Sequence, residues 1–344
     1  MDTVGIVLPI TNLKASKEEY NMRVGTIGTS FITEYILENM AKTEGIACEA
    51  IYSRTEEKAR ALADKFGVGK IYTDLDAMCA DSEIDFIYVA SPNSMHYAHV
   101  KKALNAGKHV LCEKPFVPTA AQARELVDLA KRKHLLLFEA NTTFYHPHYA
   151  WIREHLQDVG QLQMISATFC QYSSRYDLLK AGQMPNIFNP AFAGGTLMDI
   201  NVYNISFVAG LLGRPDQVQY FAGKYENGID THGVLILRYG NVICQCTGAK
   251  NTWCDNNVQI MGDKGYLRIS PMSSNCQNVR LVRRGQEDTV LELPENQWFY
   301  EIQALAELGN RKSYDICYRN LETSLIVVEI LERARQSAGI PFSE

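Results

Sequence analysis

A carboxylate and an ammonium stand next to each other at the end of an apolar stretch, where they can bind a ligand or move a proton. Glu113 and Lys114 directly follow Val110–Cys112, and the next residue is a proline, which excludes a helical conformation at Lys114. The apolar stretch is typical of a strand buried on both faces, and Thr119 with Gln122 forms a capping box that predicts a new helix. Because ligands of open parallel sheets bind at the carboxyl ends of the strands, this arrangement favours a site over an ordinary surface ion pair.

A turn after the first strong strand has residues that can bind a phosphate group. The segment GTIGTSFIT at residues 25–33 keeps Gly28 of the G-x-G-x-x-G/A fingerprint, whereas Ser30 and Thr33 replace the other two small residues. Main-chain N–H groups and the Ser30 hydroxyl can bind a pyrophosphate at the N-terminus of the following helix, although a plain strand-to-helix turn has the same pattern. The candidate cofactor contacts here are Gly28, Thr29, Ser30, Phe31 and Ile32.

The end of the second predicted strand bears on the choice between NAD and NADP. An NAD site places an acidic residue there for the ribose hydroxyls, but this chain has Ser53 and Arg54, which lie 25 and 26 residues beyond Gly28. A guanidinium beside a hydroxyl suits a 2′-phosphate, so the pattern favours NADP and leaves NAD possible. The alternative is an arginine that lies near a helix N-terminus without a ligand.

A polar segment after another central strand reaches the same edge of the sheet and adds candidate cofactor contacts at Ser91, Pro92, Asn93 and His96. His96 and His99 lie three residues apart on a predicted helix, and His146 and His148 flank a proline. Neither pair is accompanied by a carboxylate in the sequence, so no metal site is predicted.

Asp199 and Tyr203 are four residues apart on one face of a largely apolar helix predicted at residues 197–212. Such a pair is either a buried hydrogen-bonded couple or part of a site. The preceding residues 173–195 are rich in Gly, Pro, Asn and aromatic residues and are interpreted as a long functional loop. Aromatic and polar side chains suit a hydroxylated ring, and the candidate substrate contacts of this kind are Phe144, Tyr145, His146, Arg175, Tyr176 and Asn186.

Strands and helices alternate from residue 22 to about residue 140, which predicts a parallel sheet with helices on both faces. Ser53 and Ser94 are the predicted N-caps of its second and third helices. The strands are expected at residues 23–27, 46–52, 71–72, 85–90, 110–112 and 135–138, and the helices at 31–42, 53–66, 94–107 and from 119 onward.

Beyond residue 140 strands dominate, which indicates a second domain with a large, open and mostly antiparallel sheet. Its strands are expected at residues 163–172, 218–221, 233–239, 242–248, 257–261, 266–269, 279–283 and 290–293, and its helices at 151–156, 197–212, 298–308 and 321–338. The predicted α/β organisation has three parts: an N-terminal extension at 1–21, a dinucleotide-binding Rossmann domain with a doubly wound parallel sheet at 22–141, and a substrate-binding and dimerisation α/β domain at 142–344.

The composition excludes several classes of protein. With 344 residues, 46% of them hydrophobic, the chain is long enough for two hydrophobic cores. Its net charge is −5 and it has no basic stripe, so it is a poor partner for nucleic acid or an acidic membrane. Nine scattered cysteines without a C-x-x-C motif fit a reducing cytoplasm. No apolar run approaches the ~20 residues that span a bilayer, and Asp2 stands where a signal peptide carries positive charge. Residues 1–21 contribute no motif and are expected to be dispensable.

Taken together, these motifs resemble the glucose–fructose oxidoreductase / inositol dehydrogenase (Gfo/Idh/MocA) superfamily from about Met22 to the end of the chain. Tyrosine at position 203, where many members carry histidine, looks like the branch of trans-dihydrodiol dehydrogenase, D-xylose dehydrogenase and glucose–fructose oxidoreductase, which mostly use NADP. The markers of the resemblance are the modified glycine turn, Pro92-Asn93-x-x-His96, Glu113-Lys114-Pro115, and Gly194-Gly195-x-x-x-Asp199-x-x-x-Tyr203.

The resemblance implies a catalytic pair, Lys114 and Tyr203, with Asp199 as a supporting polar residue, and all three near the substrate. Glu113 and Lys114 are also expected to line the cofactor. The implied reaction transfers a hydride between a nicotinamide cofactor and a secondary carbinol or carbonyl of a sugar, cyclic polyol or dihydrodiol. The open sheet is implied to be the face of a homodimer or dimer-based tetramer.

Two other functions use the same scaffold. One is a non-catalytic sugar or nucleotide sensor, which is expected to lose Lys114 or Tyr203, but both residues are present. The other is a glycosidase that uses tightly held NAD transiently, which the Ser53-Arg54 pair disfavours.

The family pattern is modified at three positions, Ser30, Ala193 and Asn201. Asn201 replaces a glycine of that branch, so its side chain is expected in a tight place near the nicotinamide or substrate. For the proton transfer, a free tyrosine has a pKa of about 10. One cation about 4 Å away contributes ~4 kcal/mol at an effective dielectric near 20, so Lys114 is expected to lower the pKa of Tyr203 toward neutrality.

Overall fold

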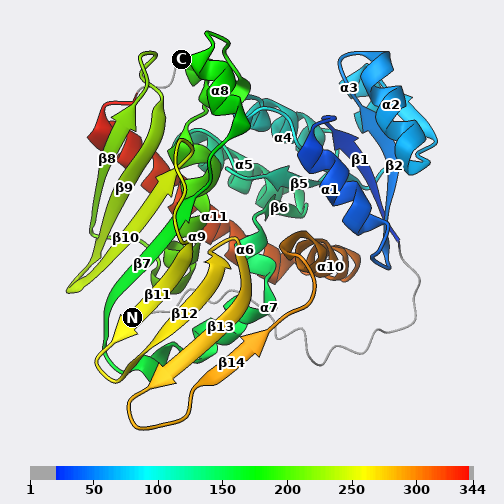
Figure 1. Cartoon of the computed structure of the whole chain (residues 1–344). Helices are drawn as coiled ribbons and strands as arrows, with labels where there is room; N and C mark the ends of the chain where they lie inside the picture. Colours follow the sequence, from blue (N-terminus) through cyan, green and yellow to red (C-terminus); the bar gives the residue numbers. More distant parts are fainter. Residues whose placement is uncertain (1–20, 341–344) are drawn as a thin grey trace.

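The computed structural model describes residues 21–340, and its N-terminal half contains a parallel six-stranded sheet (Figure 1). The strand order β3-β2-β1-β4-β5-β6 is that of a doubly wound dinucleotide-binding fold. Each predicted strand is present, which confirms the predicted parallel sheet. The strands are β1 (Met22–Ile27), β2 (Ile46–Tyr52), β3 (Lys70–Tyr72), β4 (Phe86–Val89), β5 (His109–Glu113) and β6 (Leu137–Ala140).

Helices cover both faces of this sheet, and two of their predicted starts were wrong. Thr55, not Ser53, caps the second helix, because the N–H of Ser53 still donates to the Tyr72 carbonyl of β3 at 3.1 Å. Ser94 lies inside a 3-10 turn, so the next helix begins two residues later, whereas the predicted Thr119 cap accepts from the N–H of Gln122 at 3.3 Å. The helices are α1 (Phe31–Met40), α2 (Glu56–Phe66), the unpredicted α3 (Leu75–Ala80), α4 (His96–Asn105) and α5 (Ala120–Lys133).

The C-terminal half is built on an eight-stranded sheet of order β14-β13-β12-β11-β7-β10-β9-β8. Every neighbouring pair is antiparallel except β7 and β10, which run in parallel. The prediction of a large, mostly antiparallel sheet is therefore confirmed. The strands are β7 (Leu162–Cys170), β8 (Gln217–Lys224), β9 (Asp230–Tyr239), β10 (Val242–Ala249), β11 (Asn257–Gly262), β12 (Gly265–Met272), β13 (Asn275–Arg283) and β14 (Thr289–Glu292).

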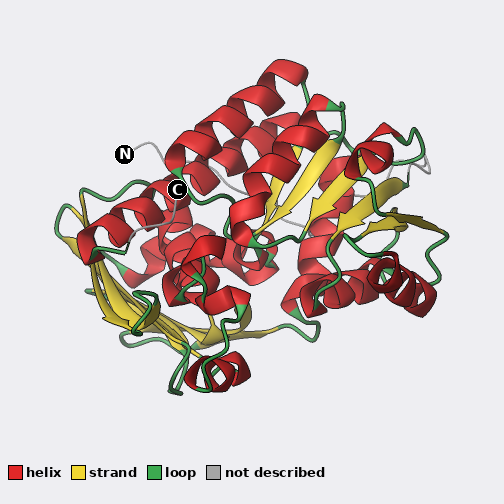
Figure 2. Cartoon of the chain, turned by 90° about the horizontal axis from the view of Figure 1, so that it is seen from above, coloured by secondary structure: helices red, strands yellow, loops and turns green. Residues whose placement is uncertain are grey.

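Helices lie behind one face of the larger sheet and join it to the smaller one (Figures 1 and 2). The long helix α11 packs on α5 and β6 of the first half and on α9 and β8 of the second, so a single hydrophobic core runs through both halves. The predicted loop at 173–195 contains a short helix. The helices are α6 (Thr142–Tyr145), α7 (Pro147–Glu154), α8 (Ser174–Lys180), α9 (Val202–Leu212), α10 (Gln297–Asn310) and α11 (Tyr314–Ala338).

The predicted helix at 197–212 consists of a π-helical turn followed by an α-helix. Its first turn, Leu197–Asn201, is π-helical, and α9 continues from Val202 to a cap at Gly213. A π turn accommodates an extra residue and is frequent at functional sites. Here it carries Asp199 and packs against β10 of the eight-stranded sheet. The predicted extension, apart from Asn21, lies outside the described residues.

Candidate active site

The carboxyl ends of β1, β2, β4 and β5 bring the predicted cofactor residues to one edge of the six-stranded sheet. The N–H of Gly28 donates to the Tyr52 carbonyl at 3.2 Å, so the glycine turn touches the end of β2. Gly28 has φ +119°, and a Cβ there would lie 2.6 Å from the Ala90 carbonyl oxygen. Glycine is thus required by the crowding between β1 and β4 as well as by the turn.

The start of α1 has the donors that a pyrophosphate needs. Ser30 occupies the N-cap position, but its exposed hydroxyl makes no capping hydrogen bond, and the first N–H groups of a helix have no partner within it. Phe31 beside it is exposed, while Thr29 and Ile32 are half-buried. The hydroxyl and main-chain donors at this turn fit an anion.

Arg54 stands exposed at the end of β2, next to the buried Ser53. Within residues 21–340, its guanidinium makes no hydrogen bond or ion pair. It is not held by a carboxylate, which leaves its donors available to a ligand phosphate.

Lys114 and Asp199 meet across the two halves of the chain. The Lys114 Nζ donates to the main-chain carbonyl of Asp199 at 2.7 Å and lies 3.3 Å from its Oδ1. The same Nζ lies 4.8 Å from the centroid of the Tyr203 ring. The π turn and the first turn of α9 therefore bring both predicted partners of Lys114 to the carboxyl end of β5.

A second ammonium completes this cluster and was not predicted. The Nζ of Lys250 donates to Asp199 Oδ2, so the one carboxylate lies between Lys114 and Lys250. Lys250 directly follows β10, which ends at the same place as its parallel neighbour β7. The sequence signal resembles that of Lys114, because in both cases a charged residue directly follows a strand.

The protonation states of this cluster follow from burial and charge. Burial by itself raises the pKa of Asp199, but Lys250 and Lys114 hold it well below the usual range, so Asp199 is a carboxylate. Burial lowers the pKa of Lys114, but Tyr203, Asp199 and Glu113 outweigh burial and raise it, so Lys114 is an ammonium.

The expected lowering of the Tyr203 pKa toward neutrality was wrong. Burial raises the pKa of Tyr203 above its ordinary value, and the opposing effect of Lys114 is too small to reverse it. Glu113, Glu301 and Asp199 add to the increase. The phenol is consequently protonated at neutral pH, which suits donation of a proton to a substrate oxygen.

Two predicted cofactor contacts, Glu113 and His96, are buried and hydrogen-bonded to neighbouring strands and loops. Glu113 is the last residue of β5 and is buried, with its Oε1 accepting from Tyr88 Oη at 2.6 Å; burial raises its pKa. His96 is also buried, with Nδ1 3.0 Å from the Pro115 carbonyl and Nε2 2.8 Å from the Ser91 carbonyl. His96 thereby connects the Lys114-containing loop to the loop after β4.

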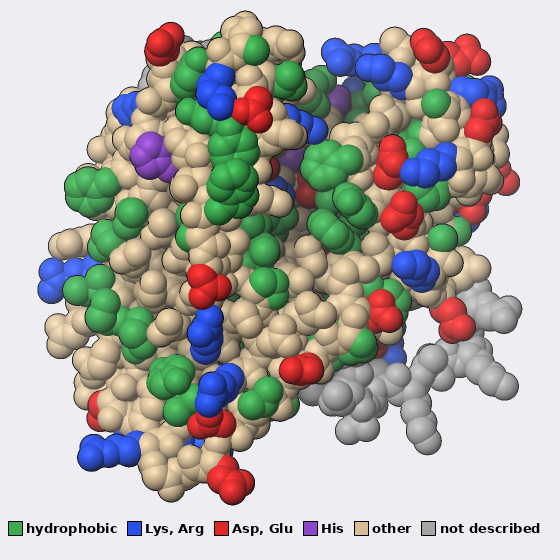
Figure 3. Space-filling view, in the orientation of Figure 1, with side chains coloured by type: hydrophobic (Ala, Val, Ile, Leu, Met, Phe, Trp, Pro, Cys, Tyr) green, Lys and Arg blue, Asp and Glu red, His purple; other side chains and the backbone are tan. Residues whose placement is uncertain are grey.

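Two contacts cross the hollow between the two halves, which is visible in Figure 3. The Asn93 Nδ2 donates to the Ala193 carbonyl at 2.9 Å. The Arg175 guanidinium lies 5.4 Å from the Phe31 ring centroid, so this predicted substrate contact stands over the glycine turn. Ala193 adopts φ +52°, a conformation that is uncommon for residues other than glycine.

The structure does not bring several predicted substrate contacts to the cluster. Phe144 and Tyr145 are 1% and 3% exposed because α6 packs on α9 and α10, and Tyr145 Oη donates to the Glu139 carbonyl at 3.0 Å. His146 is buried with them. Tyr176 packs in a small apolar cluster under the loop, and Asn186 is exposed.

Asn201 also lies elsewhere than expected. Its side chain is fully buried and donates to the Cys246 carbonyl at 3.1 Å, with its Cβ close to Gly248. It therefore fixes the π turn to β10 and does not enter the nicotinamide or substrate space.

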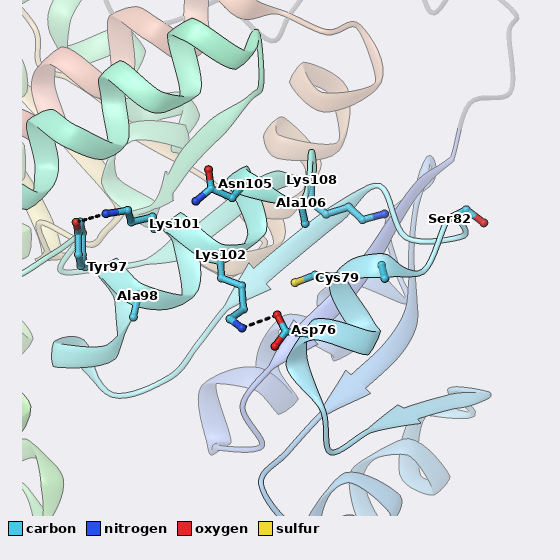
Figure 4. A pocket seen from close by; sticks show the side chains of 11 residues that line it. Asp76, Cys79, Ser82, Tyr97, Ala98, Lys101, Lys102, Asn105, Ala106 and Lys108 are labelled. Atoms are coloured by element: carbon cyan, nitrogen blue, oxygen red, sulfur yellow. Dashed lines mark hydrogen bonds and ion pairs between the residues drawn. The ribbon is translucent and has the colours of Figure 1, made fainter.

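A second groove lies away from this cluster, between α3 and α4 (Figure 4). Its lysines are already paired: Lys101 Nζ donates to Tyr97 Oη at 2.9 Å, and Lys102 Nζ to Asp76 Oδ1 at 2.5 Å. In the described part of the chain, no three His, Cys, Asp or Glu side chains converge as metal ligands, and no helix is long and apolar enough to cross a membrane.

Comparison with known proteins agrees with the fold and the motifs. Residues 22–141 match the model of an oxidoreductase family with an NAD-binding Rossmann fold, and residues 149–268 match the GFO/IDH/MocA C-terminal domain. The scyllo-inositol 2-dehydrogenase (NADP(+)) of Bacillus subtilis is 32% identical, covering 93% of this chain and 98% of that protein. The D-xylose 1-dehydrogenase (NADP(+)) of Hypocrea jecorina is 26% identical, covering 96% of this chain and 95% of that protein.

A solved structure shares the same architecture. It is a 3-ketoreductase from Actinomadura kijaniata in complex with NADP and TDP-benzene, with a TM-score of 0.81, 24% identity, and coverage of 92% of this chain and 98% of that one. The two matched regions together cover most of the chain. Lys114 belongs to the first region and contacts Asp199 and Tyr203 of the second. The chain belongs to the Gfo/Idh/MocA family of oxidoreductases.

Proposed function

We propose that this protein is an NADP-dependent dehydrogenase that interconverts a secondary carbinol and the matching carbonyl of a sugar, cyclic polyol or dihydrodiol. The observation that carries the proposal is the meeting of Lys114, Asp199 and Tyr203 at the carboxyl edge of the sheet that also holds the glycine turn. The names of the related inositol and xylose dehydrogenases support this substrate class. Residues 22–141 are proposed to bind the nucleotide, and residues 142–344 the substrate and a second subunit.

The nucleotide is proposed to lie along the ends of β1, β2 and β4. Gly28 and Ser30 would bind the pyrophosphate at the start of α1. Ser53 and Arg54 would bind the adenosine ribose with its 2′-phosphate, and Asn93 would contact the cofactor from the loop after β4. Arg175, which already stands over Phe31, is a further donor for the phosphates. The bound nicotinamide supplies the acceptor or donor for the hydride.

The proton is proposed to move between the substrate oxygen and the pair formed by Tyr203 and Lys114. In the reductive direction, the Tyr203 phenol donates to the forming alkoxide while the Lys114 ammonium stabilises the negative charge. In the oxidative direction, Tyr203 must first be deprotonated, and because burial raises its pKa this requires alkaline pH. We therefore expect oxidation to accelerate above neutral pH, and reduction to slow as Tyr203 loses its proton.

The preference for NADP is tested at Arg54. A charge-assisted pair with a 2′-phosphate contributes roughly 1.5–3 kcal/mol, or roughly ten- to a hundredfold in affinity. Arg54→Ala is expected to raise KM for NADP by that factor and to leave KM for NAD unchanged, as measured by steady-state kinetics with both cofactors. Equal losses for the two cofactors would show that Arg54 supports only the fold.

The outer face of the eight-stranded sheet is proposed to bind a second copy of the chain. Register places the exposed side chains of five strands on this one face: Met164, Phe221, Ile243, Tyr266 and Val290. Several large exposed apolar side chains on one sheet face favour an interface, and its self-complementary use gives a homodimer or a dimer-based tetramer.

Light scattering is expected to give at least twice the 38.7 kDa of one chain at micromolar concentration. Ile243→Glu, beside Met164 on this face, is expected to produce monomers, because it buries an unpaired charge in the interface. Lys264→Glu, on the turn before β12, is the matched control and should leave the mass unchanged. A wild-type monomer would rule out this interface.

A cytoplasmic location is also proposed. All nine cysteines are free thiols in the structure, which suits a reducing compartment.

A further inference from the structure

Lys250 is buried and pairs with Asp199, which in turn contacts Lys114 of the proposed proton-transfer pair Lys114 and Tyr203. We infer that Lys250 is a positioning residue that neutralises Asp199, so that the Lys114 ammonium keeps its full effect on Tyr203 and on the substrate oxygen. This inference rests on the proposed function of Lys114 and Tyr203.

The geometry shows how one carboxylate serves two ammonium groups. Asp199 Oδ2 accepts from Lys250, while Asp199 Oδ1 and the main-chain carbonyl of the same residue face Lys114. Lys250 is only 4% exposed, and its N–H donates to the Thr231 carbonyl at 2.8 Å, which fixes its backbone to β9. Within residues 21–340, Asp199 is the one carboxylate that pairs with Lys250.

The charges in this cluster do not cancel. Two ammonium groups and one carboxylate leave a net charge of +1 beside the Tyr203 ring, whereas Lys114 and Asp199 alone would be neutral. Burying a charge is costly unless it is compensated, and Asp199 already has Lys114 as an ion-pair partner. The retained charge therefore indicates an electrostatic role.

Asp199 has two opposite effects on the reaction. It holds the Lys114 ammonium in place through two contacts, but its negative charge raises the pKa of Tyr203. Lys250 cancels the charge of Asp199 from the side away from Lys114. Asp199 can therefore hold Lys114 in place without raising the pKa of Tyr203. Without Lys250, the pKa values of Tyr203 and Lys114 would both rise.

Other titratable groups also face the proton-transfer pair, but they lie on other elements. Within residues 21–340 none of them pairs with Lys250, whose carboxylate partner is Asp199, so a change at position 250 acts through Asp199. These other groups are Tyr88 on β4, Glu113 on β5, Glu139 on β6 and Glu301 on α10.

The test compares Lys250→Met, Lys250→Arg, Asp199→Asn and the double variant Asp199→Asn/Lys250→Met, each assayed for oxidation across a pH series. Lys250→Met should lower kcat at neutral pH roughly tenfold and move the rising limb of the profile about one pH unit upward, since a tenfold change corresponds to one unit. Lys250→Arg keeps the charge and should retain the wild-type profile. NADPH affinity, measured by fluorescence titration without substrate, should be unchanged in all variants.

The double variant separates an electrostatic role from a structural one. If Lys250 acts by neutralising Asp199, its replacement should have little further effect once Asp199 carries no charge. A Lys250→Met profile that coincides with wild type, or two losses that multiply in the double variant, would overturn the inference. Lys264→Met, on an exposed turn, is the control. If the wild-type enzyme oxidises no substrate of the proposed classes, the proposed function fails instead.

Discussion

Replacing Tyr203 with phenylalanine is expected to lower kcat for carbinol oxidation by roughly 10²–10⁴, the contribution of a positioned acid–base group. The ring remains in place above Phe169 and beside Lys114, because only the hydroxyl is lost. NADP affinity should therefore be unchanged, and kcat and kcat/KM should fall together, as expected for an interaction made only in the transition state. Steady-state kinetics with saturating NADP provide the measurement.

A Tyr203→Phe enzyme that keeps most of its kcat would show that Lys114 is the direct proton acceptor and that Tyr203 only binds the substrate oxygen. Phe169→Leu, which alters the packing of the same ring without removing the hydroxyl, is the matched control and should have a much smaller effect.

Lys114→Met should have an effect of similar size, with kcat at neutral pH lowered by roughly 10²–10⁴. The ammonium opposes the increase in the Tyr203 pKa that burial causes, so its removal raises this pKa further. The tyrosinate needed for oxidation then forms only at higher pH, and the residual activity should increase with pH more steeply than that of the wild type. A pH series of kcat for the wild type and the variant measures this difference.

Lys114→Arg distinguishes the two possible bases. A guanidinium keeps the positive charge but cannot accept a proton at these pH values, so partial activity is expected if Tyr203 is the base. Complete loss in Lys114→Arg, with substantial activity in Tyr203→Phe, would assign the base to Lys114. Lys102→Met, in the distant groove between α3 and α4, controls for the loss of a lysine.

The sheet edge could be predicted from the sequence because its signals are local. Buried parallel strands are continuous apolar runs, and the polar residues that follow β1, β2, β4 and β5 must then share one edge. The eight-stranded sheet was similarly predictable from alternating strands and hairpin turns. The wrong caps at Ser53 and Ser94 have a common cause, since a serine before a helical pattern does not show whether its own backbone is still bonded to a strand or a turn.

The direction of side chains was less predictable than their position along the chain. Glu113 was taken to lie beyond the strand, but it is the last residue of β5 and points into the core toward Tyr88. Phe144 and Tyr145 follow β6 at the correct edge, yet α6 turns them into the contact with α9 and α10. Such outcomes depend on packing between elements that are distant in sequence.

Electrostatic interactions between residues far apart in the chain could not be predicted from the sequence for the same reason. Lys250 lies 51 residues from Asp199, and nothing local indicates that they form an ion pair. The pKa of Tyr203 was judged from one neighbouring cation, whereas burial, with added effects of Glu113, Glu301 and Asp199, determines the direction of its shift in the folded chain.

The proposed function is tested most directly by following NADPH formation when the wild-type protein is given NADP with inositols, aldoses and dihydrodiols in turn. At least one of these classes should be oxidised, with one carbonyl product formed for each NADPH and with a rate that Tyr203→Phe lowers by roughly 10²–10⁴. Failure to reduce NADP with all three classes, or release of a sugar from a glycoside without net NADPH, would contradict a dehydrogenase.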